Sequence, residues 1–259
     1  MIMAVYSIVY WLFFLVSLPP LMMIQLAIFL VTAPFDRRRT LVHLFGCVWG
    51  MIYVWANPFW KLRVEGREKL PWHSAAVITA NHLSILDILV LYGLFAPFKW
   101  VAKGELFRVP FVGWNMTLSD YVPVWRGDRE SVRTMMARCR AHLDRGVPVL
   151  IFPEGTRSPD GELLPFKEGA FRLACDANCP VYPVAVSGTG DAIPKHGILF
   201  RTSMRARVEV LDPLYPSQFG NDPSALKEAT RAAIQAALPN GKGILGAAAK
   251  GPGAGPAGR

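Results

Sequence analysis

The residues best suited to chemistry lie at the junction of two apolar segments, in the stretch ITANHLSILDIL, residues 78–89. His82 follows the strand-like run AAVITA, and Asp87 lies in the first turn of an expected helix. In this arrangement the aspartate can accept the Nδ1 proton of the histidine and leave Nε2 as a base. A purely structural interpretation fits the same spacing, with Ser84 as the N-cap and Asp87 closing a capping box.

A second candidate block is FPEGTRS, residues 152–158, which directly follows another apolar strand-like run. Gly155 allows a tight backbone turn, and Thr156 and Arg157 offer donors that suit phosphate oxygens. The alternative is a surface turn with a local ion pair between Glu154 and Arg157. The block therefore predicts a phosphate-binding loop, with the surface turn left open.

Two further cations follow other strand-like segments. Lys103 lies in VAKGELFRVPFVGW, residues 101–114, and Arg126 ends the run YVPVW. Each of them alone is compatible with an ordinary surface charge. Ligands of parallel α/β sheets collect at the carboxyl ends of strands, so residues in these positions are candidates for a shared site.

The elements that must position these side chains alternate along the chain. Strands are expected at residues 61–65, 75–80, 98–102, 121–125, 148–152, 181–186 and 205–211, and helices at 85–95, 129–145, 168–176 and 224–238. This alternation predicts an α/β fold with a mostly parallel sheet of about seven strands flanked by helices.

The first 35 residues contain no Asp, Glu, Lys or Arg, which exceeds the roughly 18 apolar residues that mark a membrane helix. Pro19 and Pro20 are expected to break or kink this run into two short arms that enter one leaflet and return. A secretory signal peptide fits less well, because no positive charge precedes the apolar run.

Arginines 37–39 then resemble a cytoplasmic flank. Residues 41–60 form another apolar segment, and we expect an interfacial helix there with its aromatic side chains at the headgroup level: Trp49, Tyr53, Trp55 and Trp60. The predicted organisation is a membrane-embedded or interfacial helical region at 1–60, a cytoplasmic α/β domain at 61–239, and a flexible Gly/Ala/Pro-rich tail at 240–259.

The charge and cysteine content of the chain indicate which kinds of binding partner to expect. The chain carries 28 Lys and Arg against 19 Asp and Glu, a net charge of +9 that suits an anionic membrane surface or phosphate-bearing substrates. Nucleic acid is not expected, because the basic residues are scattered. The four cysteines predict reduced, packed thiols, and no metal site is expected because Cys175 and Cys179 lack a second Cys/His pair.

Together these blocks resemble the glycerolipid acyltransferase family. NHLSILD is similar to that family's N-H-x4-D signature, and FPEGTRS is similar to its F-P-E-G-T-R-S block. The intervening and last motifs are matched by Lys103, Glu105, Pro110, Gly113, Arg126 and VYPVAV at 181–186. The resemblance covers about residues 61–211, and within the family it is closest to the enzymes that acylate 1-acylglycerol-3-phosphate.

The resemblance implies an enzyme that moves a fatty acyl group from acyl-CoA or acyl-acyl carrier protein to the free hydroxyl of 1-acylglycerol-3-phosphate, giving phosphatidic acid. His82 would be the general base and Asp87 its orienting partner, without a metal, a cofactor or a covalent intermediate. The substrate-binding residues would be Lys103, Arg126, Glu154, Gly155, Thr156 and Arg157.

Three alternatives remain at this point. The acceptor could be another lysolipid or glycerol phosphate. A Ser-His-Asp hydrolase with Ser84 as nucleophile is a second, although no G-x-S-x-G elbow is present. A non-catalytic membrane-binding protein with the same fold is the third.

Overall fold

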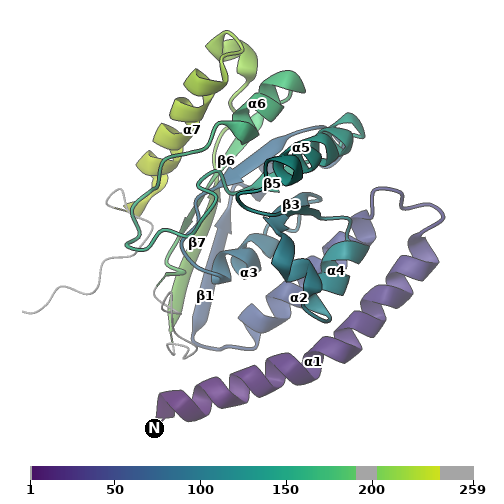
Figure 1. Ribbon diagram of the computed structural model, residues 1–259. Coiled ribbons are helices and arrows are strands. Elements are labelled where there is room, and N and C mark those ends of the chain that lie inside the picture. The colour runs from purple at the N-terminus through teal and green to yellow at the C-terminus, as the bar shows by residue number, and fades with distance from the viewer. Residues whose placement is uncertain (1, 191–202, 240–259) are drawn as a thin grey trace, which may run out of the picture.

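The computed structural model describes residues 2–190 and 203–239, and its centre is one sheet of seven strands (Figure 1). The strand order is β1-β7-β6-β2-β5-β3-β4, and every neighbouring pair is parallel except β6 and β7. The strands are β1 Trp60–Glu65, β2 Val77–Ala80, β3 Lys99–Lys103, β4 Val122–Val124, β5 Val149–Ile151, β6 Val181–Ser187 and β7 Met204–Val210. The predicted fold class, including the number of strands, is confirmed.

Burial explains why these segments become strands. Strands β2 and β6 are buried along their whole length, as central parallel strands covered on both faces are. Strand β7 instead alternates between buried and accessible residues and pairs antiparallel with β6. The continuous apolar runs in the sequence therefore mark the centre of the sheet.

Helices cover both faces of the sheet (Figure 1). Helices α2 (Thr40–Trp55), α3 (Leu86–Tyr92) and α4 (Val112–Leu118) pack on one face, and α5 (Arg129–Asp144), α6 (Gly169–Asp176) and α7 (Pro223–Ala237) on the other. Short 3₁₀ turns lie at η1 Arg67–Lys69, η2 Gly104–Arg108 and η3 Pro216–Phe219. Helix α4 was not predicted, and α3 ends three residues before its expected end.

The N-terminal run forms one helix, α1 (Ile2–Thr32), which continues through Pro19 and Pro20. The expectation of two separate arms is therefore wrong. A long helix can absorb the missing N–H groups and the ring clash by bending, and Figure 1 shows α1 as a curved helix beside α2 and α4. The segment Val5–Thr32 is long and apolar enough to cross a membrane by length and composition, and most of its surface is exposed.

Helix α2 is a core helix, which corrects the expectation of an interfacial one. Trp49, Tyr53 and Trp60 are buried, and only Trp55 of the expected aromatic belt is exposed. Ring contacts with α1 account for part of this burial, since Tyr53 packs on Phe14 with ring centroids 4.9 Å apart. Aromatic content alone does not distinguish a membrane interface from a protein core.

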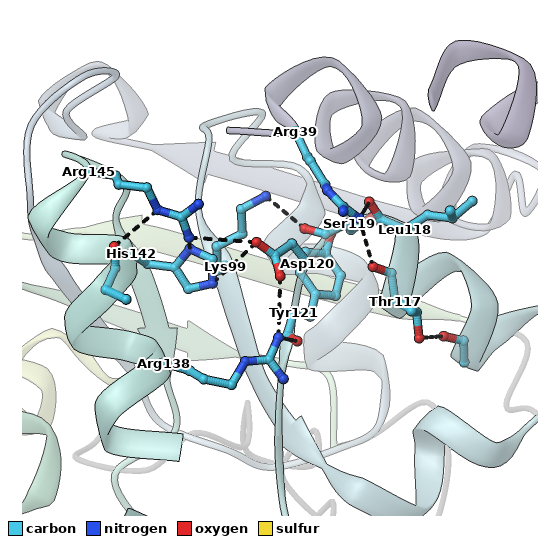
Figure 2. A network of polar contacts seen from close by, with 12 residues as sticks. Arg39, Lys99, Thr117, Leu118, Ser119, Asp120, Tyr121, Arg138, His142 and Arg145 are labelled. Atoms are coloured by element: carbon cyan, nitrogen blue, oxygen red, sulfur yellow. Dashed lines mark hydrogen bonds and ion pairs between the residues drawn. The ribbon is translucent and has the colours of Figure 1, made fainter. Parts of the chain in front are cut away.

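A polar network joins α1, α2, α4 and α5 at the edge of the sheet where β3 begins (Figure 2). Lys99 is buried there, and its Nζ donates to the Ser119 carbonyl at 2.7 Å. Gln25 of α1 donates to the Ser119 hydroxyl at 3.2 Å, and Arg39 donates to the carbonyls of Thr117 and Leu118. Lys99 and Arg39 satisfy carbonyls at the C-terminal end of α4, and together with Gln25 they fasten the N-terminal helices to the sheet.

Asp120 extends the same network toward α5 (Figure 2). Its carboxylate forms ion pairs with Arg138 at 3.3 Å and with Arg145 at 3.7 Å, and it lies 3.8 Å from the buried His142 ring. Because Lys99 opens β3 and Lys103 closes it, this network lies at the opposite edge of the sheet from the candidate site.

Candidate active site

His82 and Asp87 form a direct pair at the carboxyl end of β2. Nδ1 of His82 lies 2.8 Å from Oδ2 of Asp87, and the Asp87 side chain is completely buried. The same oxygen accepts the backbone N–H groups of Leu83 at 2.6 Å and Ser84 at 2.9 Å. The carboxylate therefore holds both the backbone that leads into α3 and the imidazole, so Asp87 has a structural contact and a possible chemical one.

The start of α3 differs slightly from the expected capping box. The helix begins at Leu86, whose N–H lies 3.4 Å from the Ser84 hydroxyl, at the long limit of a hydrogen bond. The N-cap is Ile85, which has no side-chain cap hydrogen bond, so the expected N-cap at Ser84 lies one residue too early. Ser84 is itself buried, with 3% of its surface exposed.

The His82 ring is held in place by stacking. Phe152 lies parallel to it at 15° with ring centroids 4.1 Å apart, and Trp100 stacks behind Phe152 at 5.8 Å. Because a carboxylate only accepts hydrogen bonds, Nδ1 carries the proton of this contact, and the matching neutral tautomer has its lone pair on Nε2. The side chain remains 12% exposed, so the ring is not sealed into the core.

Glu154 connects the two sequence blocks. One carboxylate oxygen accepts the His82 backbone N–H at 2.8 Å, and the other accepts the Leu164 N–H at 3.1 Å. The Ser158 N–H in turn donates to the His82 carbonyl at 2.8 Å. Burial raises the pKa of Glu154 to about 7, against the opposing effect of the two N–H donors. Its position is that of a support beneath the loop, and a direct contact with substrate stays a prediction.

The turn after Glu154 places the expected phosphate-binding residues at the surface. Gly155 has a φ of 68°, in the left-handed region that favours glycine, and Thr156 is exposed while Arg157 is partly exposed. Lys167 adds a cation that sequence reasoning did not single out. A side chain on Gly155 would begin 2.8 Å from the Lys167 Nζ, so the lysine lies directly over the turn.

Lys103 and Arg126 lie farther along the same edge. Lys103 is the last residue of β3 and aligns with Val124 of β4, two residues before Arg126. Both cations are exposed, and Lys103 forms an ion pair with Glu105 at 3.4 Å. With strands about 4.8 Å apart, β3 and β4 lie about 10 and 14 Å from β2. The structure thus places the predicted residues on one edge, in two groups.

Two further contacts of the site were not predicted. The Asn81 side chain binds both backbone groups of Val186 in β6, at 2.8 and 2.9 Å. Thr189 donates from its hydroxyl to the second oxygen of Asp87 at 2.5 Å. Both contacts join segments about 100 residues apart, and no local pattern in the sequence signals them.

Comparisons with known proteins assign this architecture to a class. A sequence model described as Acyltransferase matches residues 61–187, from β1 to the end of β6. The chain is 37% identical over 228 residues to a 1-acyl-sn-glycerol-3-phosphate acyltransferase of Chlamydomonas reinhardtii, covering 87% of this chain and 67% of that protein. It is 38% identical over 188 residues to a chloroplastic 1-acyl-sn-glycerol-3-phosphate acyltransferase of Brassica napus, covering 71% of this chain and 54% of that protein.

A solved structure agrees with these relatives. The 1-acyl-sn-glycerophosphate (LPA) acyltransferase PlsC of Thermotoga maritima superposes with a TM-score of 0.73 and 26% identity, over 91% of this chain and 95% of that one. The chain therefore belongs to the acyltransferase family, in the group whose curated members are named 1-acyl-sn-glycerol-3-phosphate acyltransferases. The resemblance seen in the sequence motifs is confirmed.

Proposed function

We propose that this protein transfers a fatty acyl group from an acyl thioester to the free hydroxyl of 1-acylglycerol-3-phosphate and so forms phosphatidic acid. The relatives named above support the acceptor. The observation that carries the chemistry is the His82–Asp87 pair, with a 2.8 Å contact and a partly accessible ring at the carboxyl edge of the sheet.

In the proposed mechanism Nε2 of His82 takes the proton of the acceptor hydroxyl as its oxygen attacks the thioester carbonyl. The buried Asp87 carboxylate stabilises the imidazolium that forms. When the tetrahedral intermediate collapses, the C–S bond breaks and the departing thiolate takes the proton back from Nε2. A base placed in this way contributes on the order of 10²–10⁴-fold in rate.

We assign the acceptor phosphate to the cations along the carboxyl edge. Arg157 and the turn at Gly155 and Thr156 lie nearest the histidine block, because Glu154 ties that turn to His82. Lys103 and Arg126 extend the positive edge. Guanidinium and ammonium groups suit phosphate oxygens, and Glu154 would act by holding the loop.

The remaining parts of the proposal concern the donor and the location. The acyl donor is acyl-CoA or acyl-acyl carrier protein, because coenzyme A and the carrier protein can each leave as a thiolate. The route needs no metal, resident cofactor or covalent acyl-enzyme. The exposed apolar surface of α1 would contact a phospholipid membrane. The arginines at 37–39 support a catalytic domain on the cytoplasmic face.

The test uses the purified full chain in detergent–phospholipid micelles with a labelled acyl group on either donor. Lysophosphatidic acid is compared with other lysolipids and with glycerol phosphate. We expect the label in phosphatidic acid. Label in another product would show that the acceptor is a different lysolipid or glycerol phosphate. No incorporation with any pair of donor and acceptor would contradict the proposal that the protein is an acyltransferase.

The same assay distinguishes the proposed acyltransferase from the alternative Ser-His-Asp hydrolase. Release of free fatty acid, with an acyl group trapped on Ser84 and lost in Ser84→Ala, would favour a Ser-His-Asp triad. The buried Ser84 hydroxyl faces the Leu86 N–H and makes this outcome unexpected.

A further inference from the structure

We propose that Thr189 is a positioning residue for acyl transfer, whose hydroxyl fixes the plane of the Asp87 carboxylate and thereby the direction of the His82 ring. This inference rests on the proposed function of the His82–Asp87 pair. It assigns a role to a residue that lies outside every motif block of the sequence and beyond the matched residues 61–187.

The two oxygens of Asp87 have different partners. Oδ2 receives three donors: Nδ1 of His82 and the backbone N–H groups of Leu83 and Ser84. Within residues 2–190 and 203–239, the donor recorded for Oδ1 is the Thr189 hydroxyl, at 2.5 Å. Asp87 and Thr189 are both completely buried. A carboxylate held at one oxygen still rotates about its terminal torsion, which has a broad energy profile, whereas donors at both oxygens fix its plane.

The fold delivers Thr189 to this place. Strand β6 lies beside β2, and the Asn81 side chain binds both backbone groups of Val186 near the end of β6. Two residues later Gly188 adopts a φ of 79°, a left-handed conformation that turns the chain inward. The contact with Asp87 is therefore built from the same strand pair that carries His82.

Loss of the hydroxyl has a defined consequence. A fully buried carboxylate that lacks one donor is left poorly compensated, and it responds by rotating or by taking up a proton. Either response weakens the Nδ1–H contact that directs Nε2 of His82. Because the effect falls on the base and not on substrate binding, it lowers kcat more than it raises KM.

The test compares Thr189→Val with Thr189→Ser in the full chain, using the acyl-transfer assay. The matched control is Thr79→Val in β2, since Thr79 is also completely buried and its hydroxyl has no hydrogen-bond partner among the described residues. We expect Thr189→Val to lower kcat about tenfold with KM within about twofold, Thr189→Ser to restore most of the rate, and Thr79→Val to leave it unchanged. An unchanged kcat in folded Thr189→Val would overturn the proposal. Thr189→Ala provides the same comparison if the valine variant does not fold.

A double-mutant cycle identifies the path of the effect. In an Asp87→Asn background, Thr189→Val should cost less than about twofold more, because the carboxylate through which it acts is gone. A full additional tenfold loss in that background would show that Thr189 acts elsewhere.

A spectroscopic readout distinguishes failure of this inference from failure of the proposed function. With ¹⁵N-labelled histidine, the five histidines give few ring signals, and His82→Ala assigns the one of interest. Thr189→Val should shift the His82 Nδ1–H signal while Thr79→Val leaves it in place. If the wild-type chain transfers no acyl group, this shift still decides the role of Thr189.

Discussion

Glu154 accepts the backbone N–H of His82 at 2.8 Å, so the acidic residue of the second sequence block supports the histidine of the first. The contact bridges β5 and β2, which are neighbours in the sheet but 72 residues apart in the chain. The two motifs thus form one unit, in which the loop that we propose to bind phosphate also fixes the position of the His82 backbone.

This relationship predicts the effect of Glu154→Gln. Glutamine offers one acceptor oxygen where the carboxylate offers two, so it loses either the His82 or the Leu164 contact. We expect a lower thermal midpoint and a decrease in kcat of about tenfold. Glu228→Gln on α7 is the control, because that side chain is 64% exposed. Unchanged kinetics and stability in Glu154→Gln would contradict the supporting role.

His82→Ala is expected to lower kcat by on the order of 10²-fold or more, because the acceptor hydroxyl loses its base. KM for the acceptor should change little, since the residues proposed to hold its phosphate are other side chains. His73→Ala is the matched control, because His73 is exposed. Near-normal turnover of folded His82→Ala would remove His82 from the mechanism.

The cations Lys103 and Arg126 are expected to contribute to binding of the acceptor phosphate. Arg126→Gln and Lys103→Gln are expected to raise KM for lysophosphatidic acid about tenfold and leave kcat within about threefold, as loss of uniform binding does. Arg133→Gln is the comparison, because its side chain is 84% exposed and lies on α5. An increase confined to KM of the acyl donor would instead assign these side chains to the donor phosphates.

Lys99 predicts a dependence of stability on pH. Burial lowers its pKa from 10.5 to about 7, with Asp120 and Asp36 opposing the shift and Arg39 and Arg145 adding to it. Between these values the unfolded chain holds a proton that the folded chain lacks, so the free energy of unfolding rises with pH across this window.

Lys99→Met removes that contribution. Thermal midpoints of both proteins at about pH 7 and about pH 9.5 provide the measurement, and the wild type should gain relative to the variant at the higher pH. Other groups titrate in both proteins and cancel in the difference. The same difference at both pH values would show that Lys99 keeps an ordinary pKa.

Local patterns in the sequence were sufficient for the sheet and for the central pair. The central strands β2 and β6 are short apolar runs, whereas β7 shows an alternating pattern, and all seven segments were predicted as strands. His82 and Asp87 are separated by five residues across a helix start, so their contact follows from local geometry.

Other features depend on tertiary contacts. Glu154 and Thr189 reach the pair from 72 and 102 residues away, which no spacing rule in a single sequence reveals. Pro19 and Pro20 were expected to break or kink this run into two short arms, but α1 continues through them as one curved helix (Figure 1). The aromatic side chains of α2 are typical both of a membrane interface and of a protein core. Most of the aromatic side chains expected at the interface are buried, partly because α1 packs against α2.

The attachment of α1 has a mechanical consequence. Gln25 is buried and bonded to Ser119, and α1 lies along the fold instead of projecting from it (Figure 1). The α/β part is therefore not joined to α1 by a flexible linker. A surface that binds the apolar side of this helix also sets the distance and orientation of His82 Nε2 relative to that surface.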